Sequence, residues 1–343
     1  MEKTKLALLG CGNVGQGLLQ IIHDKKVDVN VVAISDFKLG SVFCSDGLSV
    51  SKILDLLKEG KTLEDYNCNP SCCQGVMHKG WDVLETIENC GADIVAEMTF
   101  TDLKTAEPAT SYIEAALKKG MHVTTSNKGP TALNYKKLSK LADANGVKFL
   151  IEGTVMSGTP VFNLARETFA GCDIKEVKGI LNGTTNYILA QMENEGWSYE
   201  AALKKAQELG YAEADPTADV EGIDALAKVV ILSNVLLGAS IKPEDVPREG
   251  ISKITLADVE NAAKEGMRYK LIGSTKLENG KIIASVKPIK LPLSDPLTGV
   301  GGANNALTFD TDLLGEVTIQ GPGAGRIETG FSILVDILKI MNS

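Results

Sequence analysis

The stretch KLALLGCGNVG, Lys5–Gly15, decides the fold of the first part of the chain. It begins with an apolar run typical of a strand, and the residues after it, QGLLQIIHDK, carry apolar side chains at helical spacing. Between the two stand Gly10, Gly12 and Gly15, spaced as G-x-G-x-x-G. Gly10 permits a tight turn, Gly12 lets a pyrophosphate approach the main chain, and Gly15 lets the helix lie close to the strand. This order predicts a dinucleotide-binding unit; a glycine-rich turn without a ligand is the alternative.

Two further places in this region are expected to contact the dinucleotide. Asn13 and Val14 open the helix, where free N–H groups and the helix dipole attract phosphates. Asp36 ends the next strand-like run, VNVVAISD, about twenty residues after the last glycine, where an acid commonly binds the ribose 2′-hydroxyl of NAD. Lys38 suits the 2′-phosphate of NADP instead, in which case Asp36 only caps a loop. NAD and NADP both stay open at this point.

Strand-like and helical runs alternate through the first 150 residues, as a parallel sheet requires. GADIVAEMTF and HVTTSN are predicted strands, with the helical TAEPATSYIEAALKKG between them, and residues 38–80 are expected to be an insertion with one helix, VSKILDLLKEG. We therefore expect an α/β fold, with a Rossmann-type doubly wound parallel sheet over residues 1–152.

A different pattern begins after KFLIEGTVMSGTP, which predicts a strand and a glycine-rich turn. A helix in VFNLARETFAG, a strand in IKEVKGILNG and long helices to about Leu237 precede the antiparallel candidates KIIASVKPIKLP, NNALTFDTD and EVTIQG. A second, α+β domain is therefore expected over residues 153–320. A closing helix, within about residues 321–343, is expected to return to the first domain.

The composition excludes several classes of protein. The net charge is −9 with no long charged run, so nucleic acid and anionic membrane surfaces are not expected partners. The apolar run VVILSNVLLGA is shorter than the roughly 20 residues of a membrane span, and glycines interrupt the apolar N-terminus before it resembles a signal peptide. Seven scattered cysteines predict reduced thiols and a cytoplasmic protein, and CNPSCC has no second cluster to complete a zinc site.

The stretch AEADPTADVEGIDALAK, Ala212–Lys228, places a single lysine after five carboxylates. Asp224 and Lys228 are four residues apart, so they share a helix face, and most such pairs are exposed ion pairs contributing about 0.3 kcal/mol. Here Lys228 leads directly into VVILSNVLLGA, so its surroundings are expected to be apolar. A lysine held in such surroundings is a candidate for a shifted pKa and for acid–base chemistry.

Five segments in order, GCGNVG, SNKGP, ILNGTTNYIL, AQELGYAEADPTADVEGIDALAK and GPGAG, together resemble homoserine dehydrogenases through nearly the whole chain. The resemblance implies interconversion of L-homoserine and L-aspartate 4-semialdehyde with NAD or NADP, a step of threonine and methionine biosynthesis. It also implies a homodimer, with substrate binding and dimerisation in the second domain. The chain ends soon after the closing helix, as in short members without a regulatory domain.

The resemblance also implies roles for individual residues. Lys228 matches the proton donor, Glu213 and Asp224 match carboxylates that hold the substrate, and Tyr211 and Asp219 lie in the same block. Lys128, in SNKGP, matches a second active-site lysine that also contacts the cofactor, although a lysine at a helix start is often only a surface charge. Further cofactor contacts are expected at Thr99, Gly210 and Gly325, and a sodium ion on the carbonyls of Glu152, Val155, Ser157 and Thr159.

Two rival classes of protein remain at this stage. One is a nucleotide-binding sensor without turnover, which would have no need of both lysines. The other is an aldehyde dehydrogenase that phosphorylates its substrate, which needs a nucleophilic cysteine. Cys172, the one cysteine beyond the first domain, stands at a helix end ahead of a predicted strand, a poor position for that role.

Overall fold

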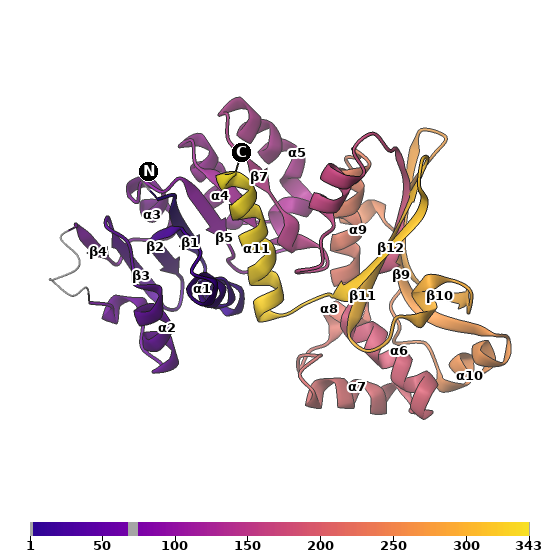
Figure 1. The fold of residues 1–343 in the computed structure, drawn as a ribbon. Helices are drawn as coiled ribbons and strands as arrows, with labels where there is room; N and C mark the ends of the chain where they lie inside the picture. The colour runs from indigo at the N-terminus through magenta and orange to yellow at the C-terminus, as the bar shows by residue number, and fades with distance from the viewer. Residues whose placement is uncertain (1–2, 68–74, 343) are drawn as a thin grey trace. The chain divides into compact units, whose positions relative to one another are not determined.

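The structure is a computed structural model that describes residues 3–67 and 75–342. CNPSCC, at residues 68–73, lies outside the described residues. The chain divides into two compact units, Met1–Gly158 with Gly325–Ser343, and Thr159–Ala324 (Figure 1). The division falls slightly later than the expected boundary at residues 152 and 153, and the closing helix belongs to the first unit.

The first unit is built on a seven-stranded sheet in the order β4-β3-β2-β1-β5-β6-β7. Five strands run parallel: β1 Lys5–Leu9, β2 Asn30–Asp36, β5 Ile94–Glu97, β6 His122–Thr125 and β7 Phe149–Leu150. β3 Gly40–Cys44 and β4 Met77–Lys79 extend the edge antiparallel. The strand order reverses at β1, where parallel sheets of this kind bind ligands.

Helices cover the sheet of the first unit: α1 Asn13–Lys25, α2 Val50–Lys58, α3 Val83–Asn89, α4 Ala109–Lys118, α5 Lys128–Ala144 and α11 Arg326–Met341. Figure 1 shows α11, in yellow, beside α1. Glycines allow this contact, because a Cβ on Gly17 would lie 2.0 Å from the carbonyl of Arg326 and one on Gly330 would lie 2.6 Å from the nitrogen of Leu18. The last segment of the chain therefore completes the core of the first unit.

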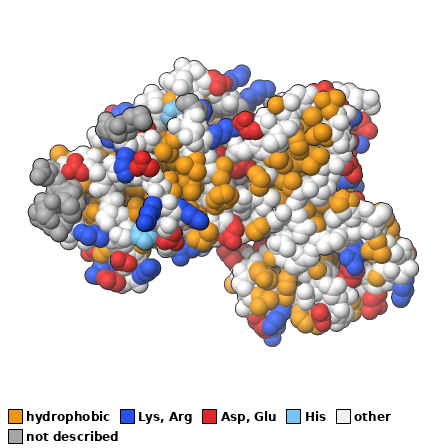
Figure 2. Space-filling view, viewed as in Figure 1, with side chains coloured by type: hydrophobic (Ala, Val, Ile, Leu, Met, Phe, Trp, Pro, Cys, Tyr) orange, Lys and Arg blue, Asp and Glu red, His pale blue; other side chains and the backbone are white. Residues whose placement is uncertain are grey.

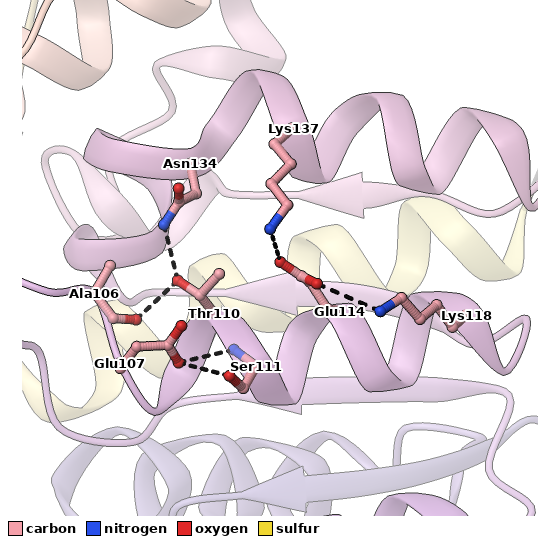
Figure 3. Close-up of polar contacts among 8 residues, drawn as sticks. All are labelled: Ala106, Glu107, Thr110, Ser111, Glu114, Lys118, Asn134 and Lys137. Carbon is pink, nitrogen blue, oxygen red and sulfur yellow. Dashed lines mark hydrogen bonds and ion pairs between the residues drawn. The ribbon is translucent and has the colours of Figure 1, made fainter.

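Polar contacts join α4 to α5, as Figure 3 shows. Asn134 Nδ2 of α5 donates to Thr110 Oγ1 of α4 at 3.1 Å, and Lys137 forms an ion pair with Glu114. The hydrogen bond from Lys137 is the main cause that lowers the pKa of Glu114. These contacts fix α5, whose first residue is Lys128.

The second unit has a five-stranded antiparallel sheet in the order β10-β9-β8-β11-β12. Its strands are β8 Ile174–Ile180, β9 Met267–Glu278, β10 Lys281–Pro292, β11 Asn304–Thr311 and β12 Gly315–Pro322. Its helices are α6 Gly183–Glu195, α7 Tyr199–Glu208, α8 Thr217–Val220, α9 Ile223–Leu236 and α10 Leu256–Lys264. α9 packs against β9 at Gly273, where a Cβ would lie 2.7 Å from side chains of Leu181 and Val229.

The expected fold class is confirmed, and two local features differ in detail from the expectation. The insertion at residues 38–80 contains two strands as well as a helix, because GSVFC pairs with β2 and buries Val42 and Cys44. Tertiary pairing there outweighs the weak strand propensity of glycine and serine. The helix expected in VFNLARETFAG contains a π-helical stretch, Leu164–Thr168, which a 3.6-residue periodicity does not reveal.

Charged side chains of both signs are interspersed on the face of the molecule seen in Figure 2. On that face Lys and Arg side chains lie among Asp and Glu side chains instead of forming one continuous basic surface. In the described part of the chain, no helix is long and apolar enough to cross a membrane.

Candidate active site

The glycine turn between β1 and α1 contains two glycines that the fold itself requires. Gly10 has a φ of +93°, and a Cβ there would lie 2.5 Å from the carbonyl oxygen of Met98. A Cβ on Gly15 would lie 2.4 Å from the carbonyl oxygen of Gly10. Gly12 differs, because it has a φ of −75° and a Cβ there would have no atom of residues 3–67 and 75–342 within 4 Å apart from its chain neighbours. The open space at Gly12 is therefore available to a ligand.

A cavity of about 870 Å³ opens beside this turn. It lies at the carboxyl ends of β1, β2 and β5, next to the point where the strand order reverses. Its lining includes the predicted cofactor contacts Gly10, Gly12, Asp36, Lys38 and Thr99, together with the aromatic residues Phe37, Trp81, Phe100 and Tyr112. Its size falls within the usual range of about 300–1,000 Å³ for a ligand pocket.

Asp36 acts as a loop cap in this structure. Its Oδ2 accepts a hydrogen bond from the N–H of Cys11 at 2.7 Å, and its Oδ1 accepts from the N–H groups of Lys38 and Leu39 at 2.9 and 3.0 Å. A carboxylate has about four acceptor positions, so capacity remains for a ribose hydroxyl. Lys38 is exposed and lines the same cavity. Capping and cofactor binding are thus compatible at Asp36.

Glu97, at the end of β5, is a buried carboxyl group that the sequence analysis did not single out. Its Oε1 accepts from the N–H of Thr99 at 2.9 Å, and its Oε2 accepts from the hydroxyl of Thr125 at 2.7 Å. Asn127 caps α5 through the N–H of Gly129 and lies 3.5 Å from Glu97 Oε1. Burial raises the pKa of Glu97. The sequence did contain a signal for this site, because Glu97 is a charged residue within the otherwise apolar stretch IVAEM.

Five other predicted residues of the first unit lie at the ends of its strands and helices. Glu97 joins the turn that carries Thr99 to the turn that precedes Lys128, the half-buried first residue of α5. Asn13 and Val14 are the first two residues of α1. Gly325, with a φ of +146°, precedes α11. Within the described residues, the lining of the cavity does not include Lys128 or Gly325.

In the second unit, Lys228 lies inside the protein. Its side chain on α9 is 8% exposed, and its Nζ donates to the carbonyl of Leu181 at 2.7 Å and to Asp224 Oδ2 at 2.8 Å. Its neighbours along α9, Ala227 and Val229 among them, are apolar and buried, as the flanking sequence predicts. The ordinary exposed ion pair is therefore excluded.

Asp219 and Asp224 are joined by an amide that the sequence analysis also missed. Asn182 Nδ2 donates to Asp219 Oδ1 at 2.7 Å and to Asp224 Oδ2 at 3.1 Å. Burial is the main cause that raises the pKa of Asp219, and the neighbouring charge of Asp224 adds to it. Two half-buried carboxylates, one buried amide and one buried ammonium thus form a single polar cluster.

Comparison with known proteins identifies the family. Residues 10–152 match the family model described as the NAD binding domain of homoserine dehydrogenase, and residues 160–338 match the homoserine dehydrogenase model. The chain belongs to the homoserine dehydrogenase family. It is an NAD(P)-dependent oxidoreductase that interconverts L-homoserine and L-aspartate 4-semialdehyde.

Individual relatives agree with this assignment along the whole chain. The NAD(+)-dependent homoserine dehydrogenase of Pseudomonas canavaninivorans is 44% identical over 100% of this chain and 97% of its own length. The crystal structure of a putative homoserine dehydrogenase from Archaeoglobus fulgidus has a TM-score of 0.87 at 36% identity, covering 98% of this chain and 99% of that one. A hyperthermophilic archaeal homoserine dehydrogenase in complex with NADPH has a TM-score of 0.82 at 31% identity, covering 99% and 98%.

The loop between α7 and α8 contains three further predicted residues. Gly210 has a φ of +76° where α7 ends, and the ring of Tyr211 lies 5.0 Å from that of Tyr187. Glu213 is exposed, and its side chain makes no hydrogen bond with any part of the chain that the structure describes. The structure therefore does not join Glu213 to the cluster of Asp219, Asp224 and Lys228.

The residues predicted to bind sodium are buried: Glu152, Val155, Ser157 and Thr159. The first three belong to the first unit and Thr159 begins the second. Ser157 has a φ of +53° and its hydroxyl is hydrogen bonded to Thr329 at 2.7 Å. Over residues 3–67 and 75–342, no group of three or more His, Cys, Asp or Glu side chains is placed to hold a metal ion. A cation in this loop would depend on carbonyl oxygens.

Proposed function

We propose that Lys228 is the general acid when L-aspartate 4-semialdehyde is reduced and, in its neutral form, the general base when L-homoserine is oxidised. The observation that carries this proposal is a buried lysine fixed by two hydrogen bonds, to Leu181 and Asp224. Reduction of an aldehyde places negative charge on its oxygen. A fixed ammonium stabilises that charge and supplies the proton.

Asp224 assists Lys228 through its charge. Burial alone disfavours the ammonium form of a lysine, whereas a carboxylate within hydrogen-bonding distance favours it. The 2.8 Å contact between Lys228 Nζ and Asp224 Oδ2 therefore supports a protonated lysine ready to act as an acid. Bound NAD(P)H supplies the hydride in this direction, and the oxidised nucleotide accepts it in the other.

The substrate is a zwitterion, and the acidic cluster suits its ammonium group. In this proposal the amino end of the substrate is bound by Asp219, Asp224 and Glu213. Tyr211 is also proposed to contact the substrate. The short distances of Asn182 to Asp219 and Asp224 support the first two assignments. The exposed position of Glu213 leaves its carboxylate accessible to a ligand.

The cofactor would be held by residues of the glycine turn and its neighbours. Gly10, Gly12 and Gly15 shape the turn, the open space at Gly12 suits the pyrophosphate, and the N–H groups where α1 begins, at Asn13 and Val14, would bind its phosphates. Lys128 is proposed as a second active-site lysine. Thr99, Gly210 and Gly325 complete the proposed set by resemblance to the family.

We propose that the enzyme uses both NAD and NADP, because Asp36 suits a ribose hydroxyl and Lys38 suits a phosphate, and both line the cavity. Initial rates of L-homoserine oxidation with each nucleotide test substrate and cofactor together. Asp36→Ala should shift the ratio of the two kcat/KM values towards NADP, and Lys38→Ala should shift it towards NAD, each by about tenfold, the scale of one hydrogen bond to a charged group. Ratios unchanged in both variants would show that other residues recognise the 2′ position.

Further parts of the proposal rest on the family resemblance. They are a sodium ion on the carbonyls of Glu152, Val155, Ser157 and Thr159, a homodimer formed through the second domain, and a place in threonine and methionine biosynthesis. The reduced thiols expected from the scattered cysteines support a cytoplasmic enzyme. We also propose that the domain over residues 1–152 binds the nucleotide and the domain over residues 153–320 binds the substrate.

A further inference from the structure

Asn182 makes three hydrogen bonds from a buried position at the start of α6. Its side-chain oxygen accepts from the N–H of Thr185 at 2.9 Å and so caps the helix. Its side-chain nitrogen donates to Asp219 of α8 at 2.7 Å and to Asp224 of α9 at 3.1 Å. Asn182 is 5% exposed. One amide therefore links the ends of three helices of the second unit.

The helix cap fixes which way the amide points. The oxygen and nitrogen of an Asn side chain are assigned from their hydrogen-bond partners. An N–H group such as that of Thr185 can only donate, so the atom facing it is the oxygen, and the NH₂ group must face the carboxylates. The two donors of this NH₂ group match the two carboxylate acceptors. The hydrogen bond to the start of α6 thus fixes the orientation of the amide.

The amide of Asn182 offsets the repulsion between the two carboxylates of this cluster. Two neighbouring carboxylates disfavour each other's ionised form, and burial adds to that effect at Asp219. Lys228 donates a hydrogen bond to Asp224, and its positive charge also favours the ionised form of Asp219. A neutral donor that bonds to both carboxylates favours their ionised forms without adding a charge.

We propose that Asn182 is a positioning residue, which holds Asp219 and Asp224 together and ionised so that they can bind the ammonium group of the substrate and keep Lys228 in place. This inference rests on the function proposed above for Lys228 and the two carboxylates. The competing explanation is that Asn182 only caps α6. Serine caps helices about as well as asparagine but is too short to reach both carboxylates, so substitution separates the two explanations.

The test compares two variants of the intact enzyme. Asn182→Ser keeps a capping group and removes both donors, and Asn182→Asp keeps the shape and the cap but adds a third carboxylate. The charged groups facing position 182 are Asp219 of α8 and Asp224 and Lys228 of α9. We expect kcat/KM for L-homoserine to fall about tenfold or more in Asn182→Ser and further in Asn182→Asp, on the scale of lost hydrogen bonds to charged groups. NAD(P) affinity should stay within about twofold.

The pH profile distinguishes positioning from capping. Loss of the donors should raise the pKa of Asp219, so the acidic limb of kcat/KM should move to higher pH, more in Asn182→Asp than in Asn182→Ser. Asn234→Ser is the matched control, because Asn234 lies on α9 and its amide exchanges hydrogen bonds with the main chain of Ile241. We expect that control to lower stability and leave the acidic limb unchanged.

An unmoved acidic limb in both Asn182 variants, with kcat/KM within about twofold of the parent, would overturn the inference and leave only a helix cap. A shift in Asn234→Ser equal to that in Asn182→Ser would overturn it too. Failure of the proposed function looks different, because Lys228→Ala would then keep parental turnover. If Lys228→Ala loses turnover while both Asn182 variants keep the kcat/KM and the pH profile of the parent, only the positioning role of Asn182 is contradicted. If one Asn182 variant does not fold by circular dichroism, the other decides the outcome.

Discussion

Two buried lysines of the second unit differ in their partners. Lys228 contacts the carboxylate of Asp224, whereas Lys270 Nζ donates to the side-chain oxygen of Asn186 at 2.9 Å and to the carbonyl of Val300 at 2.6 Å. Lys270 is 3% exposed, and burial lowers its pKa to about 8. Both acceptors of Lys270 are neutral, and although the charge of Glu193 acts on it, no carboxylate of the described residues accepts a hydrogen bond from its Nζ as Asp224 does from that of Lys228. We therefore assign Lys270 a structural role.

The lowered pKa of Lys270 predicts a specific pH dependence of stability. In the unfolded chain a lysine has a pKa of about 10.4, so between about pH 8 and pH 10 the unfolded state binds more protons than the folded state. The free energy of unfolding should therefore rise by up to about 3 kcal/mol because of this group as pH increases from about 8 to about 10. Below about pH 8 the full cost of burying the charged ammonium should remain. Lys270→Met should lack this gain.

Urea unfolding of the parent and of Lys270→Met at several pH values from about 7 to about 10.5 measures the difference. Other lysines and tyrosines titrate in both proteins, so their contributions cancel in the comparison. Parallel pH dependences of the two proteins would contradict the assignment. The sequence did not indicate this site, because MRYKLIGSTKLE places Lys270 among residues of alternating polarity and its burial depends on the loop at Val300.

At the scale of elements, the glycines in the turn between β1 and α1 have two different roles. Gly10 and Gly15 are required by the fold, and Gly12 borders the open space for a ligand. A Cβ at Gly12 has no described atom within 4 Å beyond its chain neighbours, whereas one at Gly15 would collide with the carbonyl of Gly10. Gly12→Val should therefore keep the fold and lower NAD(P) affinity by about 100-fold or more, because the side chain occupies the space of the pyrophosphate. Gly15→Val should instead lower the melting temperature.

Nucleotide titration by fluorescence and thermal unfolding, measured on both variants, check this prediction. Parental affinity in a folded Gly12→Val protein would remove the role of that glycine in holding phosphates. The sequence predicted this element well because its signals are local: a strand, three glycines and a helix within one stretch. β3 was missed because GSVFC becomes a strand only through pairing with β2, a contact that local propensity does not encode.

At the scale of the whole molecule, the sequence predicted domains over residues 1–152 and 153–320 and a closing helix that returns to the first. The structure divides the chain into Met1–Gly158 with Gly325–Ser343 and Thr159–Ala324. It predicted the pairing of Asp224 with Lys228, since four residues on one helix form a local pattern. It did not predict that Leu181 accepts from Lys228 or that Asn182 donates to Asp224, because each pair is more than 40 positions apart and meets only in the folded unit. Carbonyl acceptors such as that of Leu181 also leave no trace in the side-chain pattern.

The role of Lys228 is the central claim, and turnover of the Lys228→Ala enzyme tests it most directly. Circular dichroism and nucleotide titration first establish that the variant is folded and binds NAD(P). Lys270→Met serves as the control for loss of a buried ammonium, and Asp224→Asn, which disturbs both the lysine and substrate binding, should lower kcat and raise KM. For Lys228→Ala we predict homoserine oxidation lowered by about 100-fold or more across pH, with nucleotide affinity nearly unchanged, while Lys270→Met keeps parental turnover. Turnover of Lys228→Ala within about threefold of the parent would contradict the account, because removal of the group that transfers the proton should cost more than that.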